Sequence, residues 1–80
     1  MAKKKKYTLV KDILNLMQPD DKVYITWFAY DIPCAYSQRD GFNTAGECLE
    51  HCGFDYLNAA VGRLFGYKDM LAISAEIIHD

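Results

Sequence analysis

The sequence lacks most of the features by which enzymes and membrane proteins are recognised. It has two histidines, and it has no glycine-rich loop with the lysine and spacing needed to hold a phosphate. No apolar run approaches the roughly 20 residues that cross a bilayer, and no apolar segment of signal-peptide type follows the basic start. Three cysteines are an odd number, so reduced thiols are expected. These absences predict a cytoplasmic protein without a membrane span, without a cofactor and without catalytic activity.

The chain does contain enough apolar surface for one small core. Its 80 residues are 51% hydrophobic and 25% charged, which is an ordinary globular composition. Six Tyr, four Phe and one Trp supply large side chains for burial. We therefore expect a single domain over residues 7–80, preceded by a flexible basic tail over residues 1–6.

Charge is distributed unevenly along the chain. A basic block near the start consists of Lys3, Lys4, Lys5 and Lys6, and the remaining residues carry five cations against eleven carboxylates. Four lysines give only weak, salt-sensitive contact with phosphates, and the acidic remainder argues against direct binding of nucleic acid by the domain. A solvated tail is therefore expected, and a weak nucleic-acid-binding arm at Lys3–Lys6 is the alternative.

Two segments have the periodicity of amphipathic helices. In residues 8–17, Leu9, Ile13 and Leu16 fall on one helical face, and Pro19 ends the segment. In residues 44–52, Thr44 and Glu47 have the spacing of a capping box. We expect a helix over each segment.

Strand-like alternation of β-branched and aromatic residues predicts strands at residues 22–30, 34–38 and 70–78. Residues 55–66 fit both a helical and an extended repeat. We favour a strand over about residues 59–67, because the last strand then has an antiparallel partner. The expected order is α-β-β-α-β-β, an α+β fold in which a four-stranded antiparallel sheet has both helices on one face. A helix at residues 55–66 would instead give three strands and three helices.

This layout resembles the small proteins encoded by bacterial phages and integrated mobile elements. The resemblance lies in residues 8–14 (TLVKDIL) with 19–25 (PDDKVYI), in residues 48–50 (CLE) with 56–58 (YLN) and Val61, and in residues 71–77 (LAISAEI). It implies a phage or mobile-element origin. Such proteins include inhibitors of host defence, among them anti-CRISPR proteins, which act by binding.

The cysteines form the most suggestive chemical cluster. Cys48 and Cys52 share a face of the expected second helix, His51 lies near them, and Cys34 on the hairpin would complete a tetrahedral zinc set. We favour simple packing of the two helical thiols against the sheet. A small zinc-bound or redox-responsive regulator that uses Cys34, Cys48, His51 and Cys52 is the alternative.

The first strand has an aromatic side that is unusual for a solvent-facing surface. Tyr24, Phe28 and Tyr30 alternate with Trp27, and Tyr36 of the next strand is expected beside them. Contiguous exposed aromatics mark binding surfaces, whereas burial inside the monomer or a homodimer interface would also account for them. With the nearby carboxylates, the predicted protein-binding residues are Tyr24, Phe28, Tyr30, Tyr36, Asp20, Asp21, Asp31 and Asp40.

Together these features favour a non-catalytic protein-binding module. The expected partner is a host protein, and the expected role is inhibition of a host defence protein such as a CRISPR nuclease. An acidic surface would compete with nucleic acid for the basic groove of such a nucleic-acid-processing enzyme.

Overall fold

The computed structural model describes residues 7–39 and 41–78. In chain order the elements are α1 (Val10–Leu16), β1 (Val23–Ala29), β2 (Ile32–Tyr36), α2 (Ala45–His51), α3 (Phe54–Leu57), β3 (Ala60–Tyr67) and β4 (Met70–Glu76). The predicted tail at residues 1–6 and the predicted site residue Asp40 lie outside the described residues.

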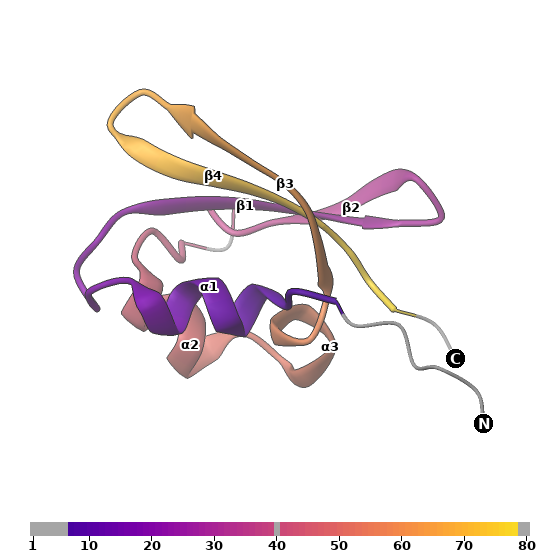
Figure 1. Cartoon of the computed structure of the whole chain (residues 1–80), viewed down its shortest axis with the longest axis horizontal. Helices are drawn as coiled ribbons and strands as arrows, with labels where there is room; N and C mark the ends of the chain where they lie inside the picture. Colours follow the sequence, from indigo (N-terminus) through magenta and orange to yellow (C-terminus); the bar gives the residue numbers. More distant parts are fainter. Residues whose placement is uncertain (1–6, 40, 79–80) are drawn as a thin grey trace.

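The elements form two layers, with the three helices under one face of the sheet (Figure 1). The predicted α+β class is confirmed. The helices at residues 10–16 and 45–51 are shorter by one or two residues at each end than the sequence patterns suggested. The prediction counted two helices, and the short α3 is an addition to it.

One sheet contains all four strands in the order β2-β1-β4-β3. The hairpins β1–β2 and β3–β4 are antiparallel, as predicted, although β2 begins at Ile32 and ends at Tyr36, two residues earlier than predicted at each end. At the centre, however, β1 and β4 run parallel, in a register that places Ile25 opposite Ile73 and Trp27 opposite Ala75. The prediction of a purely antiparallel sheet is therefore wrong, and the sheet is mixed.

The direction of the central pair follows from the path of the chain between the hairpins. α2 begins beside the start of β1, where the N–H of Ala45 donates to the carbonyl of Asp21 over 2.9 Å. α3 lies near the other end of β1, where the Trp27 indole N–H donates to the carbonyl of Tyr56 over 2.9 Å. The helices thus carry the chain along the length of β1. Because β3 then returns antiparallel to β1, its hairpin partner β4 runs parallel to β1.

Residues 55–66 contain both of the structures that the sequence pattern allowed. Phe54–Leu57 forms one turn of helix, and β3 begins at Ala60, one residue after its predicted start. Asn58 ends the helix, because its side-chain amide donates to the carbonyl of Phe54 over 2.9 Å. The favoured strand is confirmed, and its helical alternative survives only as the short α3.

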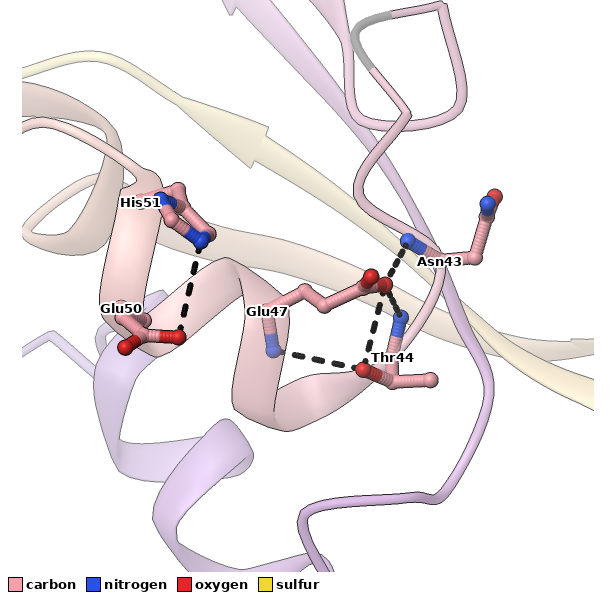
Figure 2. Close-up of polar contacts among 5 residues, drawn as sticks. All are labelled: Asn43, Thr44, Glu47, Glu50 and His51. Atoms are coloured by element: carbon pink, nitrogen blue, oxygen red, sulfur yellow. Dashed lines mark hydrogen bonds and ion pairs between the residues drawn. The ribbon is translucent and has the colours of Figure 1, made fainter.

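The predicted capping box is present at the start of α2 (Figure 2). The Glu47 N–H donates to Thr44 Oγ1 over 3.2 Å. The Glu47 carboxylate accepts from the N–H groups of Asn43 and Thr44 over 2.9 and 3.2 Å. These bonds, chiefly the one from Asn43, hold the pKa of Glu47 below its usual value. The cap therefore contributes stability at neutral pH and loses it as the pH falls and the carboxylate is protonated.

The core lies between the inner face of the sheet and the helices. Trp27 is the largest side chain of the core, and its ring centroid lies 4.9 Å from the ring centroid of Tyr56 in α3. The other fully buried apolar residues include Val10, Leu14, Val23, Ile25, Ala45, Cys48, Ala59, Ile73 and Ala75. The inner face of β1 is thus the one predicted from alternation.

Ser37 is a fully buried polar residue just beyond the end of β2. Its Oγ accepts from the N–H of Ile25 over 2.8 Å, and its own N–H donates to the carbonyl of Ile25 over 2.8 Å. A side-chain oxygen therefore satisfies a central-strand N–H at the point where the regular β1–β2 ladder has ended.

We expect Ser37→Ala to lower the free energy of unfolding by about 1–3 kcal/mol, because it leaves the buried N–H of Ile25 without a partner. Urea denaturation followed by Trp27 fluorescence measures the change, as a lower midpoint with an unchanged slope. The matched control is Ser74→Ala on the half-buried outer side of β4, with an expected change within roughly 0.5 kcal/mol. Equal midpoints for the Ser37 variant and the wild type would contradict this role.

Candidate functional site

Alternation along the strands gives the sheet two different faces. The helices cover the face that carries Ile25 and Trp27. The opposite face, which we call the outer face, has no element over it within residues 7–39 and 41–78 (Figure 1). Its side chains are Tyr24, Thr26 and Phe28 of β1, Tyr36 of β2, Arg63, Phe65 and Tyr67 of β3, and Ala72, Ser74 and Glu76 of β4.

Rings from two strands that are not neighbours meet on the outer face. Tyr24 of β1 and Tyr67 of β3 have ring centroids 5.5 Å apart at an interplanar angle of 35°. β4 passes between them and carries Ala72, which is only 1% exposed. Because Ala72 is small, the two rings can close over it. The result is an aromatic surface built from separate parts of the chain.

Cations lie over the rings at the margins of the face. The guanidinium of Arg39 is 5.6 Å from the Tyr36 centroid, and that of Arg63 is 5.2 Å from the Phe65 centroid. The ammonium of Lys68 lies 5.4 Å from the Tyr67 centroid. Such pairs are favourable by about 0.5–1 kcal/mol at exposed sites. They leave positive charge around an aromatic centre.

Negative charge is concentrated on the other layer of the molecule. The helices and the α1–β1 turn carry Asp12, Asp20, Asp21, Glu47, Glu50 and Asp55. On the outer face, Glu76 accepts from the N–H of Tyr30 over 2.9 Å. The remaining described carboxylates, Asp31 and Asp69, lie in the two hairpin turns. The folded chain is thus acidic on its helical side and mixed, with cations over rings, on its sheet side.

The structure brings together the aromatic part of the predicted site and separates the acidic part from it. Tyr24, Phe28 and Tyr36 lie half-buried on the outer face. Tyr30 lies in the β1–β2 turn with a φ of 53°, and it lines a shallow groove at the end of this face together with Ala60 and Glu76.

The predicted acidic residues lie at opposite ends of β1. Asp20 and Asp21 precede the strand, and Asp21 caps the turn by accepting from the N–H of Gln18 over 2.8 Å. Asp31 follows the strand, in the β1–β2 turn with a φ of 66°. Within the described residues, these carboxylates therefore do not form one cluster with the rings.

The predicted site did not include the β3 part of the outer face. Phe65 and Tyr67 are 39% and 42% exposed, and Arg63 and Lys68 lie over them. The signal was the alternation of Arg63 and Phe65 within the expected strand. The β3–β4 hairpin carries a second signal, because it sets Phe65 opposite Ala72 and Arg63 opposite Ser74, on the side of β4 away from Ile73.

The four residues of the zinc alternative do not meet. Cys34 is exposed on β2, whereas Cys48 is buried under the sheet. His51 is exposed, stacks on Phe42 at 5.6 Å and lies 3.5 Å from a Glu50 oxygen (Figure 2). Among the described residues, no group of three or more Cys, His, Asp or Glu is placed to hold a metal ion.

Cys48 and Cys52 do lie together, and their contact suppresses thiolate formation. A hydrogen bond shared with Cys52 raises the pKa of the Cys48 thiol far above its ordinary value, and burial adds to the effect. Cys48 also donates weakly to the carbonyl of Phe42 over 3.9 Å. A thiol in this state packs as an apolar side chain and is a poor nucleophile.

We expect the three thiols to react with iodoacetamide in a fixed order. Exposed Cys34 should be alkylated first, and Cys48 should stay protected until the protein unfolds, because only the accessible thiolate attacks. Peptide mapping by mass spectrometry at pH 8 measures the order, and the same reaction in denaturant is the control. Alkylation of native Cys48 as fast as Cys34 would contradict the assignment.

Because the pKa of Cys48 is raised in the folded state, the free energy of unfolding depends on pH in the alkaline range. The folded state holds the thiol proton of Cys48 more tightly than the unfolded state does. The contribution of Cys48 to the free energy of unfolding is therefore complete below the ordinary thiol pKa of about 8.5. It is lost as the pH rises above that value.

Comparisons with known families, with curated proteins and with solved structures give no match. In the described part of the chain, no helix has the length and apolar character needed to span a membrane. A role for the outer face is therefore inferred from its own geometry.

Proposed function

We propose that the chain is a non-catalytic protein-binding module and that the outer face is its contact surface. The observation that carries the proposal is an aromatic face over which residues 7–39 and 41–78 place no covering layer. Tyr24, Tyr36, Phe65 and Tyr67 supply rings from three different strands. Tyrosine and arginine are among the residues most enriched where binding energy is concentrated in protein interfaces.

The proposed partner is a cytoplasmic host protein, and the proposed role is inhibition by a phage or mobile-element product. The two layers suit such a role in different ways. The outer face supplies apolar area for affinity. The acidic helical layer supplies negative charge that competes with phosphates for the basic groove of a nucleic-acid-processing enzyme, such as a CRISPR nuclease.

We expect Tyr36→Ala to weaken binding of the host partner by about 30-fold or more, which corresponds to at least about 2 kcal/mol for a tyrosine at which binding energy is concentrated. Stoichiometric capture from host lysate by the immobilised full chain identifies the partner, and titration with that purified partner measures the change. The matched control is Phe54→Ala, which removes an exposed ring from α3 in the helical layer.

The control variant should bind as tightly as the wild type. Absence of a stoichiometric partner would contradict the binding role itself. Equal losses for Tyr36→Ala and Phe54→Ala would leave the binding role in place and remove the outer face as its site.

One observation favours a second candidate function, the binding of single-stranded nucleic acid. Arg39, Arg63 and Lys68 lie over rings on the sheet side, while six carboxylates lie on the helical side. Rings on which bases stack, with cations beside them, are the means by which many proteins hold single strands. Because the charges are separated in space, the overall acidity of the chain opposes a phosphate backbone less strongly at the sheet side.

We expect this second function to appear as salt-dependent binding of fluorescent oligothymidylate. Tyr67→Ala should reduce affinity roughly fivefold or more, because one stacking ring contributes about 1–3 kcal/mol. Phe54→Ala is again the matched control, and a chain without residues 1–6 separates the face from the lysine block. Binding that is lost with residues 1–6 and unchanged by Tyr67→Ala would assign it to the block.

A further inference from the structure

The two edge strands of the sheet differ in how well they are protected. β2 is five residues long, contains Pro33 and is bulged against β1 beyond Trp27. Short length, proline and bulges are the usual means by which proteins prevent pairing at a sheet edge. β3 is eight residues long and contains no proline, and its bulge against β4, between Val61 and Arg63, lies near the start of the strand. Its edge is therefore the one open to another strand.

The chain covers only the beginning of the β3 edge. The N–H of Val61 donates to the carbonyl of Thr8 over 2.7 Å, and the N–H of Val10 donates to the carbonyl of Ala59 over 3.0 Å. From Gly62 to Tyr67, no strand within the described residues lies on the side of β3 away from β4. About half of the backbone N–H and C=O groups of these six residues therefore point away from β4 and have no partner among the described residues.

The free segment is exposed on both faces. Leu64 points to the helical side of the sheet and is still 47% exposed, because the tip of the β3–β4 hairpin rises away from the helical layer (Figure 1). On the outer side, Phe65 and Arg63 are exposed as well. A second strand placed here would remove apolar area from water on both of its faces.

The sequence of this segment complements itself in the antiparallel direction. Residues 62–66 read Gly-Arg-Leu-Phe-Gly. Leu64 thus has one large side chain on either side of it, and a glycine stands at each end. Residues opposite each other in an antiparallel pair lie on the same face of the sheet. Pairing about Leu64 therefore sets Arg63 of one copy against Phe65 of the other, twice. It also sets the two Leu64 side chains against each other.

The Arg63–Phe65 pairing repeats a contact that the single chain already makes. The Arg63 guanidinium lies 5.2 Å from the centroid of its own Phe65. In the pair, each ring would have a second cation beside it across the two-fold axis, and cross-strand pairs of this kind stabilise sheets.

The chain limits the other registers. A pair centred on Arg63 would set like charges against each other. It would also require Val61 to pair outward, where Thr8 already accepts its N–H. A pair centred on Phe65 is the neighbouring alternative, and it would leave Leu64 opposite Gly66.

We propose that two copies of the chain associate through the β3 edges, antiparallel and centred on Leu64, to form a continuous eight-stranded sheet. The interface is isologous, so the same residues contribute from both copies. This association is independent of the proposed host partner. It leaves the outer faces uncovered and places them side by side on one side of the joined sheet.

The first test measures the mass of the full chain by sedimentation equilibrium. It compares the wild type with two variants, each of which carries a new lysine on one edge of the sheet. We expect the wild type to approach twice its 9.2 kDa at high-micromolar concentration. Leu64→Lys should sediment as a single chain, because a charge directed into the pair opposes it. Ile32→Lys, at an exposed apolar residue of the β2 edge, is the matched control and should dimerise like the wild type.

The second test determines the register of the two β3 strands, and it does not require a variant that breaks the dimer. With Cys34 replaced by serine, Leu64→Cys should form an intermolecular disulfide under mild oxidation, because the two β carbons face each other across the axis. Phe65→Cys should form it poorly, and the reverse result would assign the neighbouring register. A wild-type chain of single mass with no crosslink in either variant would overturn the dimer, as would a Leu64→Lys chain that dimerises like the wild type. Neither result depends on whether Tyr36→Ala affects a host partner.

Discussion

β1 and β4 lie parallel in the middle of the sheet, and the position of both candidate surfaces depends on that pairing. It places β3 at the far edge, where Tyr67 reaches across β4 to Tyr24 at 5.5 Å. It also sends the β3–β4 hairpin beyond the helical layer, which exposes Leu64 (Figure 1). The pairing in turn depends on a crossover by α2 and α3, held at one end of β1 by Asp21 and at the other by Trp27.

Most local features of this fold were predictable because they depend on neighbours in sequence. The apolar face of α1 is an exception, because Leu16 is 85% exposed and Val10 and Leu14 are buried instead. The capping box of Thr44 and Glu47 needs a spacing of three residues and nothing else. The inner face of β1 follows from alternation in residues 22–30, and the β3–β4 hairpin follows from two alternating runs joined by a short turn. The sequence pattern therefore predicted the α+β class and nearly all the elements.

The predictions that were wrong concern contacts between segments that are distant in sequence. Alternation is the same in parallel and antiparallel strands, so it carries no information on the direction of β4 relative to β1. The missed β3 side of the outer face is different, because the local β3–β4 hairpin already sets Phe65 opposite Ala72 and Arg63 opposite Ser74. What depends on the pairing of β4 with β1 is that these residues share one surface with Tyr24. The acidic residues were grouped with the rings because Asp20 and Asp31 lie close to β1 in sequence. In space a seven-residue strand separates them.

The outer face and the β3 edge can both serve as contact surfaces, because they use different groups of this small chain. Eighty residues supply one helical layer, which covers one face of a four-stranded sheet and leaves rings exposed on the other. Edge pairing through β3 acts within the plane of the sheet and uses backbone groups, so it does not cover those rings. A dimer formed in this way would present two outer faces on one side of a single sheet. Two linked faces engage a repeated or elongated partner far more tightly than either alone, since the second contact is made within the same complex. The protected β2 edge then explains why assembly would stop at two copies and not continue from sheet to sheet.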